Sequence, residues 1–282
     1  MHNHRLFVAY KPPFISSNKY LSHLKKRYNI KKGGFSGTLD PFAKGVLIVA
    51  FGKYTKLFRF LKKSPKVYEA TLWLGAKSKT LDIERVKKIE NVLPIKKDRV
   101  KDALNSIVGQ ISYYPPIFSA KKIDGIRAYM FAKKEKDINL KKITSYIYNI
   151  ELINYTHPFI TFRAEVSEGT YIRSLGDLIA KRLGTIGVLS SLERIKEGEF
   201  FYKNQKSLNP IKYLATKENY TFLTKDEIKK GRKIFLKDMK IKDDGIYHIV
   251  FDDFFSIIEI KNGNIKYLLN NIWINKYDKN ES

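Results

Sequence analysis

The longest apolar run of this 282-residue chain is Val46 to Phe51, and a glycine lies on either side of it. Its length is far below the roughly 20 residues that a membrane-spanning helix needs. A short apolar run between turn residues is typical of a buried strand, so residues 46–51 are predicted to lie inside a sheet. The amino terminus has no long apolar stretch followed by a small-residue cleavage site, and we expect neither a signal peptide nor membrane insertion.

The other segments mix strands and helices without regular alternation. Strand-like patterns occupy residues 6–10, 67–74, 143–155 and 159–167. Helical spacing or capping residues mark residues 17–28, 54–61, 98–108 and 171–183. Residues 75–95 are polar, and we expect a flexible connection there. Such an order of elements predicts an α+β fold.

The chain is expected to divide near residue 220. Beyond this point the sequence predicts short strands, joined by turns at Asp243-Asp244-Gly245 and Asn262-Gly263-Asn264. A segment of about 60 residues buries little apolar surface alone, so it is expected to pack on the rest of the protein. We therefore expect a main domain over residues 1–219 and a small β-rich domain over residues 220–282.

The charge of the chain favours a polyanionic partner. Lysine and arginine total 54 against 28 aspartates and glutamates, a formal net charge of +26. Nucleic acid is the first candidate and an anionic membrane surface the second. The chain has no cysteine, which excludes disulfides, cysteine-ligated metal sites and thiol nucleophiles and fits a cytoplasmic location.

A glycine-rich segment over residues 33–41 ends in Asp40-Pro41 and carries the first candidate site residue. Its glycines allow tight turns and close approach to a ligand. The local pattern favours a helix start, with Asp40 as the N-cap and Pro41 in the first helical position. The other interpretation is a carboxylate that a loop presents beside the buried strand.

Two later segments also carry candidate chemistry. In residues 169–174, Arg173 is either a surface cation on the predicted helix or the partner of a buried carboxylate, which it would hold ionised and oriented. Residues 115–129 interleave prolines, basic residues and aromatic residues. They predict either a rigid turn with a solvated basic face or a surface that grips the RNA backbone and stacks on bases.

These three segments, taken in their order along the chain, resemble the TruB family of tRNA pseudouridine synthases. Further matching motifs are Lys11-Pro12, Ser16-Ser17-Asn18, Gly45-Val46-Leu47, Gly52-Lys53-Tyr54-Thr55-Lys56, and Tyr68 ahead of Leu74-Gly75. The resemblance covers the chain from about residue 5 to residue 200. A weaker resemblance relates the tail to the small PUA-like RNA-binding module of this family.

The resemblance implies a catalytic domain with a mixed, largely antiparallel sheet and flanking helices. It implies isomerisation of uridine-55 in the TΨC loop of tRNA to pseudouridine, without a metal or cofactor. The implied catalytic residues are Asp40, Tyr68 and Arg173, while Tyr171 and Leu192 match positions that line the uracil pocket. We also expect a cytoplasmic monomer with no obligate protein partner.

The residue types suit this chemistry. The glycosidic C–N bond must break, uracil must rotate, and a C–C bond must form. A carboxylate serves as a nucleophile on the sugar or base, or as a base at the sugar, and the sequence leaves these routes open. A uridine in a folded loop must be flipped out, and stacking on Tyr68 offsets part of the lost base stacking.

Several positions depart from the family pattern. Phe35 replaces a histidine and retains the ability to stack on a base, Lys79 stands where an acidic residue is expected, and Glu193 stands where arginine is common. Such changes leave room for a non-catalytic RNA-binding or RNA-folding protein. A carboxylate-dependent nuclease or glycosidase is a third interpretation, and it needs a second carboxylate near Asp40.

Overall fold

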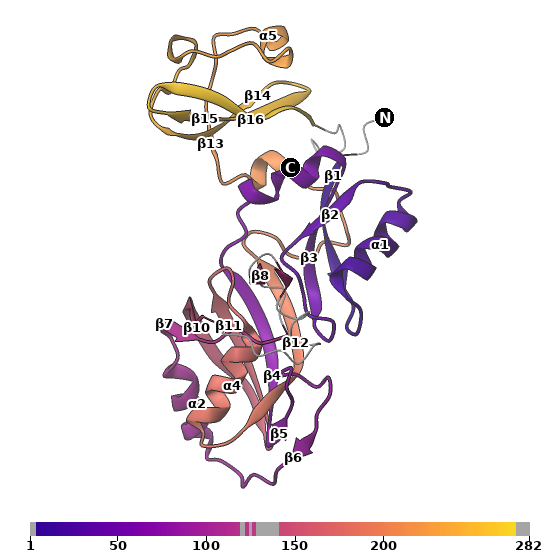
Figure 1. The fold of residues 1–282 in the computed structure, drawn as a ribbon, viewed down its shortest axis with the longest axis vertical. Coiled ribbons are helices and arrows are strands. Elements are labelled where there is room, and N and C mark those ends of the chain that lie inside the picture. The colour runs from indigo at the N-terminus through magenta and orange to yellow at the C-terminus, as the bar shows by residue number, and fades with distance from the viewer. Residues whose placement is uncertain (1–3, 119–121, 124–125, 128–140, 275–282) are drawn as a thin grey trace.

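The structure, a computed structural model, describes residues 4–118, 122–123, 126–127 and 141–274. One large sheet forms the body of the protein, with the strand order β1-β3-β12-β4-β11-β10-β7 and with β2 paired to β3 (Figure 1). Its strands are β1 (Arg5–Lys11), β2 (Gly33–Ser36), β3 (Lys44–Phe51), β4 (Lys66–Leu74), β7 (Gly109–Tyr113), β10 (Ile143–Thr156), β11 (Phe159–Val166) and β12 (Gly187–Glu197). All neighbouring strands are antiparallel except β3 and β12, which confirms the mixed, largely antiparallel α+β fold.

The apolar run of residues 46–51 is confirmed as a buried strand, β3. Its side chains alternate between two apolar clusters. Val46 and Ile48 pack toward the carboxyl-terminal part of the chain. Leu47 and Val49 pack under helix α1 (Ser17–Arg27), which Ser16 caps by accepting a hydrogen bond from Lys19. Because both faces are covered, every position of the run is apolar.

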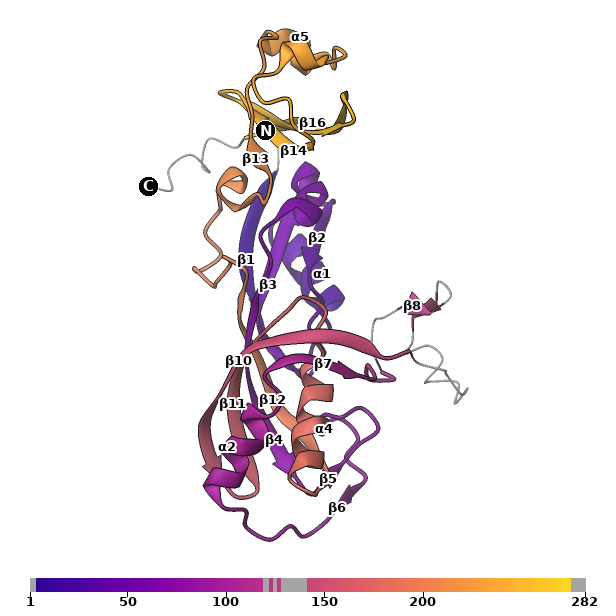
Figure 2. The same ribbon diagram turned by 90° about the vertical axis from the view of Figure 1, so that its left-hand side faces the viewer.

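The other half of the sheet is covered by helices on one face only (Figure 2). Helices α2 (Lys97–Asn105) and α4 (Ile172–Arg182) pack on the apolar side of β11, where Ile160 and Phe162 lie in the core. On the other side, Arg163 pairs with Glu69 near solvent. The alternation predicted for residues 159–167 is therefore confirmed, and it reflects a sheet with one open face.

The structure differs from the sequence-based prediction in two segments. Residues 54–61 do form a helix, but it is a 3-10 helix, η1 (Gly52–Phe60). Residues 75–95 contain a two-stranded sheet: β5 (Ala76–Lys77) pairs with β6 (Lys88–Ile89), and Thr80 and Asp82 between them are buried. These polar side chains hydrogen-bond to one another, so burial there leaves no apolar periodicity in the sequence.

The carboxyl-terminal part forms a second sheet in the order β13-β14-β15-β16. It packs on the main body, as expected, because Phe255 and Ile272 share an apolar cluster with Leu6 and Ile48. The predicted turn at Asn262-Gly263 is confirmed, with φ values of 50° and 75°. The elements of this part are η2 (Pro210–Tyr213), β13 (Lys217–Glu218), α5 (Lys225–Lys229), η3 (Leu236–Asp238), β14 (Gly245–Val250), β15 (Phe254–Lys261) and β16 (Asn264–Trp273).

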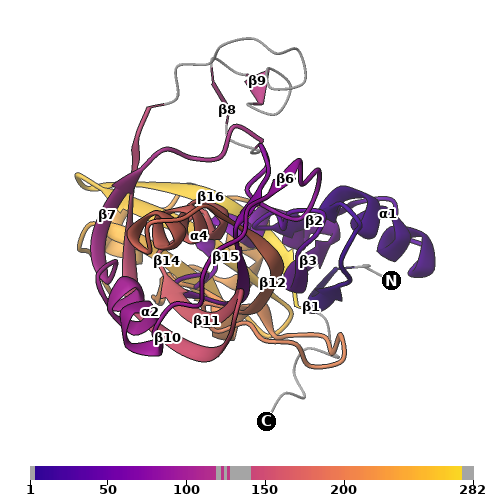
Figure 3. The same cartoon turned by 90° about the horizontal axis from the view of Figure 1, so that it is seen from below.

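Residues 119–121, 124–125 and 128–129 of the third candidate segment lie outside the described residues. Its described part includes β8 (Lys122–Ile123) and β9 (Ile126–Arg127), which pair with each other apart from the main sheet (Figure 3). Within the described residues, no helix is long and apolar enough to cross a membrane.

Candidate active site

A cleft of about 280 Å³ lies between the glycine-rich loop, strands β4 and β12, and the start of α4. Five residues expected at the site line this cleft: Asp40, Tyr68, Tyr171, Arg173 and Leu192. They come from four separate elements of the fold. Residues that lie far apart in the sequence therefore meet in the tertiary structure.

Asp40 lies in an extended loop and does not begin a helix. After Asp40-Pro41 the chain makes a short turn, with the Ala43 amide donating to the Asp40 carbonyl, and then enters β3 at Lys44. The helix-start interpretation is therefore wrong. The loop presents the carboxylate to the cleft, where 32% of the Asp40 side chain is exposed.

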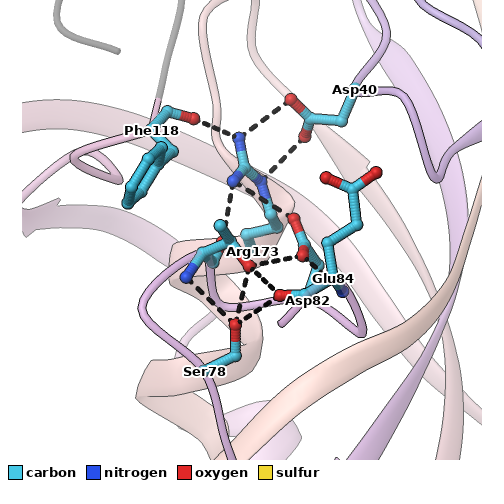
Figure 4. Close-up of polar contacts among 7 residues, drawn as sticks. Asp40, Ser78, Asp82, Glu84, Phe118 and Arg173 are labelled. Atoms are coloured by element: carbon cyan, nitrogen blue, oxygen red, sulfur yellow. Dashed lines mark hydrogen bonds and ion pairs between the residues drawn. The ribbon is translucent and has the colours of Figure 1, made fainter. Parts of the chain in front are cut away.

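Arg173 binds this carboxylate with two nitrogens (Figure 4). Its Nη2 donates to Asp40 Oδ1 at 2.8 Å, and its Nε lies 2.8 Å from Oδ2. Nη2 also donates to the Phe118 carbonyl and Nη1 to the Thr80 carbonyl. Only 3% of the Arg173 side chain is exposed, so the surface-cation interpretation is wrong and pairing with a carboxylate is confirmed.

Asp82 is a second acidic partner of Arg173 that sequence reasoning missed. Its Oδ2 lies 3.4 Å from Nη1 of Arg173, and its Oδ1 accepts from Thr80 and from the Glu84 amide. Burial raises the pKa of Asp82 to about 6, against the lowering effects of the Thr80 hydrogen bond and the Arg173 charge. Asp82 lies three positions after the exposed Lys79, which stands where the resemblance leads us to expect an acidic residue.

Two buried polar residues hold the backbone on either side of Asp40. The Ser17 hydroxyl donates to the Leu39 carbonyl and accepts from the Leu39 amide, both at 3.0 Å. The Lys11 ammonium donates to the Pro41 carbonyl and to two other carbonyls. Burial lowers the pKa of Lys11 to about 8, while the nearby Asp40 charge raises it. Both residues belong to motifs that carry the family resemblance, although no role was predicted for them.

The aromatic and apolar walls of the cleft come from β4, β12 and the residue before α4. Tyr68 in β4 is opposite Arg194 in β12, and Leu192 is opposite Ala70. Tyr171 is half-buried and immediately precedes α4. Such a pocket offers the carboxylates of Asp40 and Glu168 beside flat apolar surfaces, which suits a planar base beside a sugar.

Phe35 and Glu193 lie away from the cleft. Phe35 in β2 packs against the apolar cluster under α1 and is not among the residues that line the cleft. Glu193 accepts from the Tyr10 hydroxyl at 2.8 Å and pairs with Lys44 at 3.1 Å. Because neighbouring strand residues face opposite sides, its departure from the family pattern does not bring a negative charge into the cleft.

Comparison with known proteins agrees with the fold. The structure is similar to a chain of the "Crystal Structure of a Cbf5-Nop10-Gar1 Complex", with a TM-score of 0.66 at 19% identity, covering 96% of this chain and 84% of that chain. This likeness establishes a shared fold. Residues 25–172 match the family described as TruB family pseudouridylate synthase (N terminal domain).

Relatives of nearly the same length are much closer in sequence. The tRNA pseudouridine synthase B of a Nitratiruptor species is 57% identical over 268 residues, covering 95% of this chain and 98% of the relative. The protein of the same name from Campylobacter jejuni is 51% identical, with the same coverage. The chain belongs to the TruB family of pseudouridylate synthases.

Proposed function

We propose that this protein is a tRNA pseudouridine synthase that isomerises uridine-55 in the TΨC loop of tRNA. The observation that carries this proposal is the Asp40 carboxylate, exposed in an aromatic-walled cleft with both oxygens against one guanidinium. Relatives named tRNA pseudouridine synthase B over almost the whole chain support the same substrate.

The proposed roles follow from the geometry. Arg173 fixes the direction of the Asp40 carboxylate, because a guanidinium binds both carboxylate oxygens at once. Asp40 then acts on the target nucleotide while the C–N bond breaks and the C–C bond forms. Tyr68 stacks on the flipped uracil, an interaction worth about 1–3 kcal/mol per base. Tyr171 and Leu192 form the rest of the uracil pocket.

We propose that residues 1–219 carry the catalytic site and residues 220–282 add a PUA-like contact with RNA. The second part exposes aromatic rings beside lysines: Lys240 lies 5.2 Å from the Tyr220 ring centre, and Lys233 lies 5.3 Å from that of Phe235. Such pairs suit a backbone of phosphates with accessible bases. The protein is proposed to work in the cytoplasm as a monomer, without an obligate protein partner.

The test uses purified protein, an unmodified tRNA transcript, and no added metal or cofactor. Pseudouridine is mapped by chemical labelling, and we expect one modified uridine, in the TΨC loop. Asp40→Asn, with its fold checked by circular dichroism, is expected to give no product even in a single turnover. Tight tRNA binding without pseudouridine would overturn the proposal in favour of an RNA-binding protein.

Product analysis also tests the nuclease or glycosidase interpretation. That chemistry needs a second carboxylate that reaches the substrate, and Asp82 is the acidic residue that shares Arg173 with Asp40. Only 3% of the Asp82 side chain is exposed, which argues against this role for Asp82. Glu168 also lines the cleft, with 54% of its side chain exposed and Lys63 at 3.4 Å, so the products decide between the two chemistries. We expect neither free uracil nor a cleaved strand, and either product would contradict the isomerase.

A further inference from the structure

A second buried charge cluster contacts the Asp40 loop at Gly37, three residues before the carboxylate. Glu197 lies at its centre and is completely buried. Its Oε1 is 3.2 Å from the Lys66 ammonium, and its Oε2 is 3.2 Å from Nη2 of Arg194. Lys66 and Arg194 both line the cleft, so this cluster forms part of its wall.

A β-bulge brings Glu197 to this position. Arg194 is opposite Tyr68, and Glu197 is opposite Lys66, with a shift of register between residues 194 and 196. In a regular strand, residues three apart point to opposite faces. The extra residue of the bulge turns Glu197 onto the face of Arg194, and bulges often re-aim side chains in this way next to active sites.

Arg194 links the cluster to the loop backbone. Its Nη2 donates to the Gly37 carbonyl at 2.7 Å, and its Nε donates to the Val46 carbonyl at 2.8 Å. Gly37 has a φ of +64°, and a Cβ added there would lie 2.9 Å from Glu197 Oε1. A glycine is therefore needed at residue 37 for the loop to close on the cluster.

The carboxylate of Glu197 is what allows two buried cations to lie side by side. Within the described part of the chain, neither of its oxygens has a hydrogen-bond partner beyond these ion pairs. Removing one partner of a buried charge cluster leaves the others uncompensated, and they move toward solvent. Without Glu197, Arg194 and Lys66 would repel each other, and Arg194 would lose its fixed direction toward Gly37.

We propose that Glu197 is a positioning residue: it holds Arg194 against the Gly37 carbonyl and thereby fixes the loop that carries Asp40. This inference rests on the proposed function, because it takes Asp40 as the catalytic carboxylate. A displacement of about 1 Å in a reacting group costs about 10²-fold in rate. Loss of the contact between Arg194 and the Gly37 carbonyl is therefore expected to slow the chemical step more than it weakens tRNA binding.

The test compares Glu197→Gln with Glu199→Gln on the same tRNA transcript. Glu199 is a matched control, since it also pairs with a lysine, Lys62 at 3.3 Å, but 52% of its side chain is exposed. For E197Q we expect a single-turnover rate about 10- to 100-fold below wild type and a tRNA Kd within about threefold. For E199Q we expect wild-type values. A folded E197Q with the wild-type rate would overturn the inference.

A double variant tests the route through Arg194. Arg194→Lys keeps the positive charge but loses the planar guanidinium, whose nitrogens contact two carbonyls and a carboxylate at once. If Glu197 acts through Arg194, the double variant is no slower than the slower single variant, whereas independent effects multiply and would contradict the route. If E197Q is unfolded at the assay temperature, Glu197→Asp replaces it, because the shorter side chain cannot reach both cations. A wild-type rate in folded E197D would then overturn the inference.

Different experimental results refute the proposed function and this inference. A wild-type protein that forms no pseudouridine refutes the proposed function. An active wild type whose rate is unchanged by loss of Glu197 refutes the positioning role alone.

Discussion

Asp40 and Asp82 bind the same guanidinium group through different nitrogens of Arg173 (Figure 4). The two carboxylates differ in their access to solvent: 32% of the Asp40 side chain is exposed, against 3% for Asp82. One is therefore available to a substrate, and the other can act only through Arg173. The four predictions below follow from this division and from the contacts around it.

Asp82 is expected to give the reaction a pH dependence below neutrality. Burial raises the pKa of Asp82 to about 6, so it is mainly ionised at pH 7 and becomes protonated as the pH falls below 6. Protonation removes the charge that helps to hold Arg173. We expect the single-turnover rate to fall from pH 7 to pH 5 in the wild type. Asp82→Asn is expected to be about tenfold slower at pH 7, the loss of one charge-assisted contact, and to lack this fall. Identical pH profiles for the two proteins would contradict the assignment.

Arg173→Lys is expected to lower the single-turnover rate by about 10²-fold or more. An ammonium is a point charge, and it cannot contact two carboxylates and two carbonyls in the directions of a planar fork. The variant retains a positive charge, which makes it a sharper test than removal of the side chain. Thermal unfolding should accompany the rate measurement, and a stable variant with near-wild-type turnover would show that the geometry of the pair is unimportant.

Tyr68 offers a comparison between two substitutions. Tyr68→Ala removes the ring, so we expect a weaker tRNA complex by up to about 1–3 kcal/mol together with a slower reaction. Tyr68→Phe retains the ring but removes the hydroxyl. If the hydroxyl assists a proton transfer, the phenylalanine variant binds tRNA normally and reacts slowly. Equal rates for Tyr68→Phe and wild type would limit the role of Tyr68 to stacking.

Lys11 is expected to contribute mainly to stability. Its ammonium is buried and donates to the carbonyls of Pro12, Ile15 and Pro41. Lys11→Met leaves these acceptors without their donor, and we expect the free energy of unfolding to fall by about 1–3 kcal/mol. Urea denaturation measures this change, with Lys19→Met on the exposed side of α1 as the control. No loss of stability would mean that the desolvation cost of the charge equals the gain from its hydrogen bonds.

The elements that the sequence predicted best are those whose apolar pattern reflects their surroundings. Residues 46–51 are apolar throughout because β3 is covered on both faces, and residues 160–166 alternate because β11 has one open face. The structure of residues 75–95 could not be predicted in this way. Their buried atoms, those of Thr80 and Asp82 among them, are polar and satisfy one another, so no hydrophobic period marks them.

By itself, the sequence determined the fold class, the family resemblance, and five of the residues that line the cleft. Those properties depend on local periodicity and on motifs that are read along the chain. Only the tertiary structure decided that Asp40 is a loop carboxylate, since Asp-Pro has the same local pattern at a helix start. It also decided that Arg173, 133 residues further along, is its partner. The bulge that turns Glu197 toward Arg194 arises from pairing between strands, and no pattern within one strand records it.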